Sequence, residues 1–273
     1  MNRRIVILAA ARVLAALAAL GSLASPCAAA SAARLGGFGI VYLHGKAGLP
    51  GGFNGGILSA LEDEGALVAT PEMPWSFQRR YGATYDQAMA EIDGVVAALK
   101  AKGAVRIVVI GHSLGANAAI GYAARHPDLA GVVALAPGHL PETGQLRDFV
   151  AEAVARARRL IDAGSGDEPQ TFPDMAEGIP LIATATPVVY LSMFDPDGPA
   201  VIPKNAAAIG SAPHPPPLLW VVGKLDPIDR RGPEYAFAAA AKNPKSKYIE
   251  VFADHLMTPL VAHSQVVEWI NAL

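Results

Sequence analysis

Apolar runs rich in β-branched residues alternate with segments of helical periodicity along most of the chain. Residues 39–43, 106–110 and 131–135 are short continuous apolar runs of the kind that form buried strands. Between the first two, Thr84 can cap a helix whose apolar positions recur at helical spacing until Gly103 ends it. Strands that alternate with helices predict a mostly parallel sheet flanked by helices, with the carboxyl ends of its strands at one edge.

Between residues 138 and 214 the alternation breaks. A helix with one charged and one apolar face is predicted at 145–163, and prolines at 213 and 215–217 close the stretch. We interpret residues 138–214 as an insertion of mostly helical character, a cap over the strand edge. The remaining predicted elements are helices at 57–64, 116–125 and 263–273, and strands at 66–69, 218–222 and 248–252.

Composition narrows the class of protein. The 273 residues are 52% hydrophobic and only 17% charged, whereas a disordered chain would be poor in apolar residues and strongly charged. The length suits one large α/β domain. The net charge of −2, from 22 basic and 24 acidic residues, lacks the positive balance that nucleic-acid binding requires, so we expect no nucleic-acid partner.

Residues 1–33 have the pattern of a secretory signal peptide. Arg3 and Arg4 form a basic start, residues 5–23 are mostly Ala, Leu, Ile and Val, and small residues at 28–33 offer cleavage sites. An uncleaved membrane anchor is the alternative, but Arg12 divides the apolar run into pieces too short to span about 30 Å of hydrocarbon comfortably.

Cleavage after Ala30 or Ala33 changes the charge and the cysteine content. Losing three arginines leaves 19 basic against 24 acidic residues, a net charge of −5, and removes Cys27, the only cysteine. Core packing without a disulfide must then stabilise residues 34–273. We expect a periplasmic or secreted protein with no stable membrane span.

The strongest chemical signal is Gly111-His112-Ser113-Leu114-Gly115, a G-x-S-x-G motif between a predicted strand and a predicted helix. A nucleophile in such a motif occupies a sharp, strained turn, and only glycine-sized neighbours let the strand and the helix approach each other. The backbone N–H of Leu114, at the helix start, can then stabilise an oxyanion. This context favours a nucleophilic Ser113 over a chance pentapeptide.

A serine nucleophile needs a histidine base and an acid that orients it, in the chain order Ser, acid, His. Of the seven histidines, His255 alone lies in a loop directly after a late predicted strand. Asp226 follows the strand at 218–222 and is the candidate acid. Asp229 lies deeper in the same loop, and Asp254 adjoins His255, where a side chain usually cannot fold back onto the imidazole.

The loop after the first strand, residues 44–48, should supply the second oxyanion donor. The backbone N–H of Lys46 is our first candidate and that of Ala47 the second. The Lys46 side chain either attracts anionic groups or is solvated, while His44 is expected to pack or to hold the loop. Three aromatic residues nearby, Trp75, Phe77 and Tyr81, fit core packing as well as a substrate wall.

On the His44-Gly45 pair, the G-x-S-x-G motif, Asp226 and His255, the sequence resembles the α/β-hydrolase family over nearly the whole mature chain. The resemblance implies an α/β-hydrolase fold with a cap, a Ser-His-Asp triad and no cofactor or metal. It makes Ser113 the nucleophile, Asp226 the acid, His255 the base, and the N–H groups of Leu114 and Lys46 the oxyanion donors. The two N-terminal antiparallel strands common in the family are missing from the predicted pattern.

The resemblance implies a serine hydrolase of the esterase or lipase kind (EC 3.1.1), which cleaves a small-molecule ester or related acyl bond through an acyl-enzyme. An acyltransferase with the same triad and a non-catalytic binding module on this fold stay open. Peptidase, thioesterase and dehalogenase activities also stay open, although dehalogenases usually carry a carboxylate at the nucleophile position. The cap suggests a partly covered pocket for a small or medium acyl group. The sequence does not reveal the oligomeric state.

Overall fold

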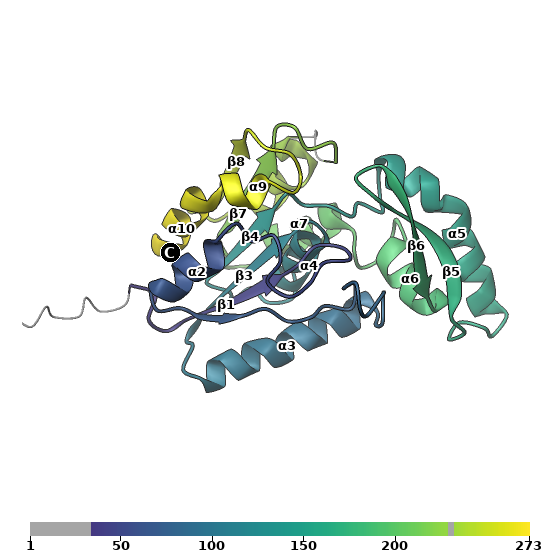
Figure 1. Cartoon of the computed structure of the whole chain (residues 1–273), viewed down its shortest axis with the longest axis horizontal. Coiled ribbons are helices and arrows are strands. Elements are labelled where there is room, and N and C mark those ends of the chain that lie inside the picture. The colour runs from purple at the N-terminus through teal and green to yellow at the C-terminus, as the bar shows by residue number, and fades with distance from the viewer. Residues whose placement is uncertain (1–33, 229–231) are drawn as a thin grey trace, which may run out of the picture. The chain divides into compact units, whose positions relative to one another are not determined.

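The computed structural model describes residues 34–228 and 232–273. At its centre is a six-stranded sheet in which every neighbouring pair of strands is parallel (Figure 1). The predicted parallel sheet is therefore confirmed. The export signal predicted for residues 1–33 lies outside the described residues. In sheet order the strands are β2 (Leu67–Ala69), β1 (Phe38–Leu43), β3 (Arg106–His112), β4 (Gly131–Leu135), β7 (Leu218–Gly223) and β8 (Lys247–Val251).

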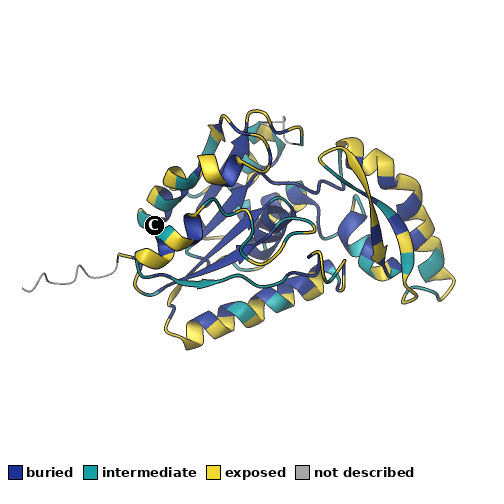
Figure 2. Ribbon diagram, in the orientation of Figure 1, coloured by how far each residue is buried: buried dark blue, intermediate teal, exposed yellow. Residues whose placement is uncertain are grey.

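The inner strands are buried on both faces, as Figure 2 shows. In β1, Val41 and Leu43 belong to one core and Ile40 and Tyr42 to the other, because successive side chains of a strand point to opposite faces. One core is covered by α3 (Tyr85–Ala101), α4 (Leu114–Ala123) and α7 (Ile202–Gly210), and the other by α2 (Ile57–Asp63) and α10 (His263–Asn271).

Helix α3 begins where its sequence predicts. The Thr84 hydroxyl accepts the N–H of Gln87, and the Gln87 side chain accepts the N–H of Thr84, which together form a capping box. The helix ends at Ala101, two residues before Gly103, whose φ of 101° suits glycine better than any other residue.

The segment between β4 and β7 contains more than the predicted helix. Helix α5 (Gly144–Asp162) is followed by an antiparallel hairpin of β5 (Gln170–Ala176) and β6 (Ile179–Ala185), and then by α6 (Pro187–Phe194). The sequence pattern did not predict the hairpin. The strands contain prolines and an aspartate, which are depleted in strands, and the turn at Glu177 and Gly178 has positive φ at both positions without the usual Asn-Gly sequence.

Short elements complete the carboxyl-terminal third. No helix among the described residues is long and apolar enough to cross a membrane. Among all the described residues, no antiparallel strand joins the central sheet. The short elements, which were not predicted, are η1 (Pro233–Tyr235), α8 (Phe237–Ala240) and α9 (Thr258–Val261).

Candidate active site

Ser113 is the single residue between β3 and α4, in the sharp turn that the G-x-S-x-G motif predicts. Its φ of 57° and ψ of −119° lie in a region that non-glycine residues rarely occupy. A Cβ atom added to Gly111 would lie 2.0 Å from the carbonyl oxygen of Gly115, and one added to Gly115 would lie 2.0 Å from that of Leu43. Glycine is therefore required at both positions for the strand and the helix to approach.

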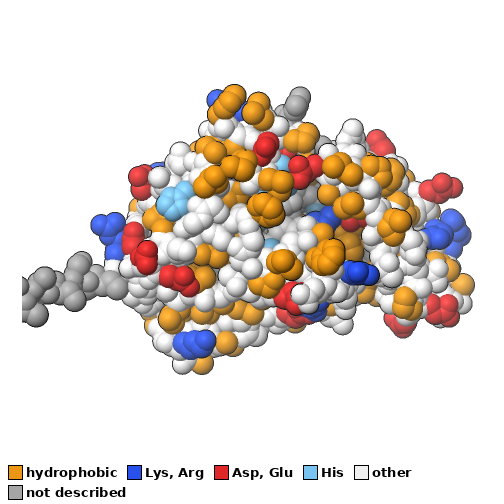
Figure 3. Space-filling model, viewed as in Figure 1, with side chains coloured by type: hydrophobic (Ala, Val, Ile, Leu, Met, Phe, Trp, Pro, Cys, Tyr) orange, Lys and Arg blue, Asp and Glu red, His pale blue; other side chains and the backbone are white. Residues whose placement is uncertain are grey.

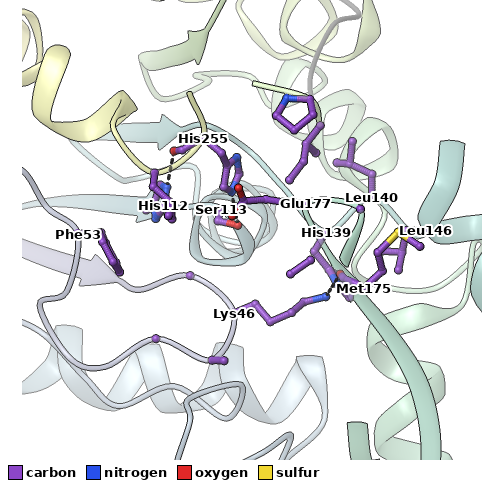
Figure 4. Close-up of a pocket in the computed structure, with 18 of the residues that line it drawn as sticks. Lys46, Phe53, His112, Ser113, His139, Leu140, Leu146, Met175, Glu177 and His255 are labelled. Carbon is purple, nitrogen blue, oxygen red and sulfur yellow. Dashed lines mark hydrogen bonds between the residues drawn. The ribbon is translucent and has the colours of Figure 1, made fainter. Parts of the chain in front are cut away.

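The structure brings Ser113, His255 and Asp226 together at the carboxyl edge of the sheet, after β3, β8 and β7 respectively. His255 Nε2 lies 2.8 Å from Ser113 Oγ (Figure 4). On the other side of the ring, His255 Nδ1 lies 2.6 Å from Asp226 Oδ2. Because a carboxylate only accepts, Nδ1 carries the proton and Nε2 is free to accept the serine hydroxyl. This tautomer is the one in which the imidazole can take a proton from Ser113.

The buried Asp226 carboxylate is held from two sides. It is fully inaccessible to solvent, and its second oxygen accepts the backbone N–H of Ile228 at 2.8 Å. Asp254, the acid rejected from the sequence, instead accepts the N–H of Met257 at 2.8 Å near the start of α9. The other rejected acid, Asp229, lies outside the described residues.

The loop of residues 44–48 packs directly against Ser113, since a Cβ atom on Gly45 would lie 3.1 Å from that of Ser113. Ala47 N–H donates to the carbonyl oxygen of Trp75 at 2.9 Å, so our second candidate for an oxyanion donor is already occupied. Lys46 remains the candidate in this loop. Leu114 opens α4, and the first N–H groups of a helix have no partner within it.

His44 holds this loop in place, as expected. Its Nδ1–H donates to the carbonyl oxygen of Gly45 at 2.8 Å, and its Nε2 accepts the N–H of Met73 at 3.0 Å. Burial lowers the pKa of His44, which favours the neutral ring that this pair of hydrogen bonds requires. The buried Trp75 donates its indole N–H to the carbonyl oxygen of His44 at 2.8 Å and so serves the loop rather than a substrate wall.

The Lys46 side chain departs from both expectations. It is neither solvated nor free to attract an anion, because Nζ lies 2.5 Å from Asp174 Oδ1. Nζ also lies 2.8 Å from the carbonyl oxygen of Met175 (Figure 4). The lysine side chain is 8% exposed and that of the aspartate 3%. Sequence reasoning missed this pair because the two residues lie 128 positions apart.

Three further residues of the site were not predicted. His112 Nε2–H donates to the carbonyl oxygen of His255 at 3.0 Å, and burial lowers the pKa of His112 to about 4, so this ring is neutral at pH 7. His139 Nε2–H donates to the carbonyl oxygen of Met193 at 2.8 Å, and burial lowers its pKa to about 3. A Cβ atom on Gly138 would lie 2.9 Å from Ser113 Oγ, so this glycine leaves open the space in front of the hydroxyl.

A cavity of about 450 Å³ opens in front of Ser113. The segment between β4 and β7 forms much of its wall. Phe53 and Leu256 line the cavity and are 63% and 41% exposed, and Figure 3 shows further apolar side chains on this face. Among the described residues that line it, Lys46 and Glu177 carry the charges, and Lys46 is neutralised by Asp174. The segment between β4 and β7 contributes residues 139–140, 143–146 and 175–178 to the wall of the cavity.

Comparison with known proteins places this geometry in a wider group. The sequence profile described as "Alpha/beta hydrolase family" matches residues 40–269. No curated protein matches the chain in sequence.

Solved structures share the fold at low sequence identity. One of the metagenome-derived lipolytic enzymes LipS and LipT is 15% identical with a TM-score of 0.62, covering 87% of this chain and 95% of its own. A monoacylglycerol lipase from Paleococcus ferrophilus is 22% identical with a TM-score of 0.60, at coverages of 86% and 94%. Est1E from Butyrivibrio proteoclasticus, with ferulic acid bound, is 16% identical with a TM-score of 0.57, at coverages of 86% and 88%.

Proposed function

The chain belongs to the alpha/beta hydrolase family, and on that basis we propose that it is a serine hydrolase that cleaves a carboxylic ester or a related acyl bond. The observation that carries this proposal is the hydrogen-bonded series Ser113–His255–Asp226, with the hydroxyl on a strained turn that faces a cavity. A binding module would need neither the strain nor the buried carboxylate behind the imidazole. Both features fit an activated nucleophile.

In the proposed reaction Ser113 Oγ attacks the substrate carbonyl carbon while its proton passes to His255 Nε2. The Asp226 carboxylate stabilises the imidazolium through Nδ1–H. The N–H groups of Leu114 and Lys46 stabilise the oxyanion of the tetrahedral intermediate. As the C–O bond to the leaving alcohol breaks, His255 returns the proton to that alcohol and an acyl-enzyme forms.

Hydrolysis of the acyl-enzyme repeats these steps with water. His255 takes a proton from the water as its oxygen attacks the acyl carbon, and then returns that proton to Ser113 Oγ as the acid is released. The cavity of about 450 Å³ is at the smaller end of ligand pockets, which supports a small or medium acyl group. The lipolytic and esterase names of structures with this fold are consistent with an ester substrate.

The test combines covalent labelling with turnover of p-nitrophenyl acetate and butyrate. We expect a fluorophosphonate probe to label the parent, and Ser113→Ala to lose both labelling and turnover, since loss of a triad nucleophile costs on the order of 10⁶-fold in kcat. Ser211→Ala, which changes an exposed serine directly after α7, is the control and should behave as the parent. Parent-like turnover by Ser113→Ala would refute the mechanism, and an unlabelled, inactive parent would favour a binding module.

An acyltransferase would use the same residues and differ only in its acceptor. Adding a small alcohol to the assay and measuring new ester against free acid separates the two reactions, and we expect free acid to dominate. We also propose, from the sequence pattern alone, that residues 1–33 direct export and are removed. Amino-terminal sequencing of the mature protein tests this, and an intact Met1 in the exported fraction contradicts it.

A further inference from the structure

The Lys46 side chain joins the loop beside the nucleophile to strand β5. Nζ donates to Asp174 Oδ1 at 2.5 Å and to the carbonyl oxygen of Met175 at 2.8 Å. Both Asp174 and Met175 belong to β5 of the hairpin. A buried ion pair thus connects the loop of residues 44–48 to the inserted segment between β4 and β7.

Every oxygen of the Asp174 carboxylate has a partner. Oδ1 also accepts the N–H of Met175 at 2.6 Å, and Oδ2 accepts the hydroxyl of Tyr81 at 2.8 Å. Phe194 packs against the pair, with its ring centre 5.6 Å from Lys46 Nζ and 5.5 Å from that of Tyr81. Such an arrangement has one geometry, because any displacement of the lysine leaves a buried charge without its partner.

Stability alone gives little reason for this pair. Apolar residues of similar volume commonly stabilise a core as well as a buried ion pair does, since burying two charges is costly. What the pair supplies is a defined position for Lys46. Two hydrogen bonds hold the backbone on either side of the Lys46 amide. Ala47 N–H donates to the carbonyl oxygen of Trp75, and the Trp75 indole N–H donates to the carbonyl oxygen of His44.

We propose that Asp174 is a positioning residue that acts through the Lys46 side chain and fixes the Lys46 backbone N–H where the oxyanion develops. This inference rests on the proposed function. Oxyanion donors act at 2.7–3.1 Å from the developing charge, so a small shift of the loop weakens them. Residues 175–178, which follow Asp174, line the cavity. The contact of the hairpin with Lys46 therefore places one wall of the substrate cavity and the oxyanion donor at the same time.

The first test is Asp174→Asn, which keeps the side-chain shape and removes its charge. We expect kcat to fall at least about tenfold, and by less than the 10²–10³-fold that loss of a whole oxyanion donor costs. The fall should be equal for p-nitrophenyl acetate and butyrate, with KM within about threefold of the parent, because a developing charge is affected and acyl binding is not. Tyr81→Phe, which removes one hydrogen bond to Asp174, should lower kcat less in the same direction.

The matched control is Asp195→Asn. Asp195 follows α6 in the same inserted segment, and its carboxylate pairs with Arg158 at 2.7 Å on the surface. This variant loses an ion pair by the same substitution without contact to the loop of residues 44–48. We expect parent values of kcat and KM.

The second readout is inhibition by an alkyl boronic acid, whose tetrahedral adduct on Ser113 places an oxygen at the oxyanion site. Its inhibition constant should rise in Asp174→Asn by the same factor as kcat/KM falls, an effect that a general loss of stability would not produce. A folded Asp174→Asn with parent kcat, or a fall in kcat with unchanged boronate inhibition, overturns the inference. If Asp174→Asn does not fold, parent kcat and boronate inhibition in Tyr81→Phe overturn it.

These outcomes separate the two proposals. A parent that neither hydrolyses esters nor reacts with fluorophosphonate refutes the proposed function and this inference with it. A parent that does both, while Asp174→Asn matches it in kcat and in boronate inhibition, refutes this inference alone.

Discussion

Gly138→Ala tests how the space in front of the Ser113 hydroxyl, the proposed nucleophile, is kept open. The added methyl group would lie 2.9 Å from Ser113 Oγ and 3.3 Å from His255 Cε1. The first distance is too short, so either Oγ turns away and its 2.8 Å hydrogen bond to His255 breaks, or the methyl group stays where a substrate carbonyl must approach. A reacting carbon needs to come within about 3–3.5 Å of the nucleophile. Both outcomes reduce turnover.

The size of the effect follows from the displacement. A misplacement of about 1 Å between reacting groups costs on the order of 10²-fold in rate, which is about 2.7 kcal/mol of barrier. Stability should change by no more than about 1 kcal/mol, because alanine reduces the conformational freedom of the unfolded chain and Gly138 is not among the residues with positive φ. Activity and stability are therefore expected to separate.

The assay measures kcat/KM for p-nitrophenyl butyrate, the rate of fluorophosphonate labelling, and the urea midpoint. Gly94→Ala is the control, since this exposed glycine lies within α3 and an added Cβ would meet nothing within 4 Å. We expect Gly94→Ala to keep parent activity and to gain about 0.5–1 kcal/mol of stability. A Gly138→Ala protein that is folded and hydrolyses and labels at the parent rate would show that the space at residue 138 is not used by the substrate.

Two further predictions concern charge. Burial holds the pKa of His112 at about 4 and that of His139 at about 3, whereas an unfolded histidine titrates near 6.5. Below pH 6.5 the unfolded chain therefore binds more protons than the folded protein, and the free energy of unfolding should fall by at most about 1.4 kcal/mol per pH unit for each ring. Identical urea midpoints at pH 7 and pH 5 would contradict this. Glu177→Gln removes an exposed carboxylate that lines the cavity and should lower KM about two- to threefold for esters with an anionic acyl group, at low salt only, because about 1 M salt screens such a charge. Unchanged KM values at low salt would exclude this electrostatic effect.

Local patterns predicted most of the architecture because strands and helices of this fold have strong periodicities. Thr84 and Gly103 bound α3 correctly to within two residues, since capping and chain termination are local chemistry. The hairpin of β5 and β6 was missed for a physical reason. Prolines 173 and 180 lie within its paired strands, where proline is unfavourable. The hairpin also contacts α5 and α6, and no local sequence pattern reveals those contacts.

In the candidate site, too, some features follow from local sequence and others depend on the tertiary structure. The strained turn at Ser113 follows from the two glycines around it, because a Cβ atom at either position clashes with backbone. Ser113, His255 and Asp226, which were chosen from their order along the chain, lie within hydrogen-bonding distance of one another in series. Their roles in catalysis stay a prediction. By contrast, the choice between Lys46 and Ala47 needed coordinates, since only the fold shows that Ala47 N–H is engaged by Trp75.

Taken by itself, the amino-acid sequence determined the order along the chain of the six strands of the central sheet and of helices α2, α3, α4, α5 and α10. It also determined the turn that carries Ser113 and the loops from which Asp226 and His255 extend. Each of these depends on periodicity or steric limits over a few neighbouring residues. The tertiary structure alone decided that Lys46 pairs with Asp174, that His112 supports the backbone of His255, and that Gly138 faces the serine hydroxyl. Those contacts join residues far apart along the chain, and only the packing of the folded protein determines which distant groups meet.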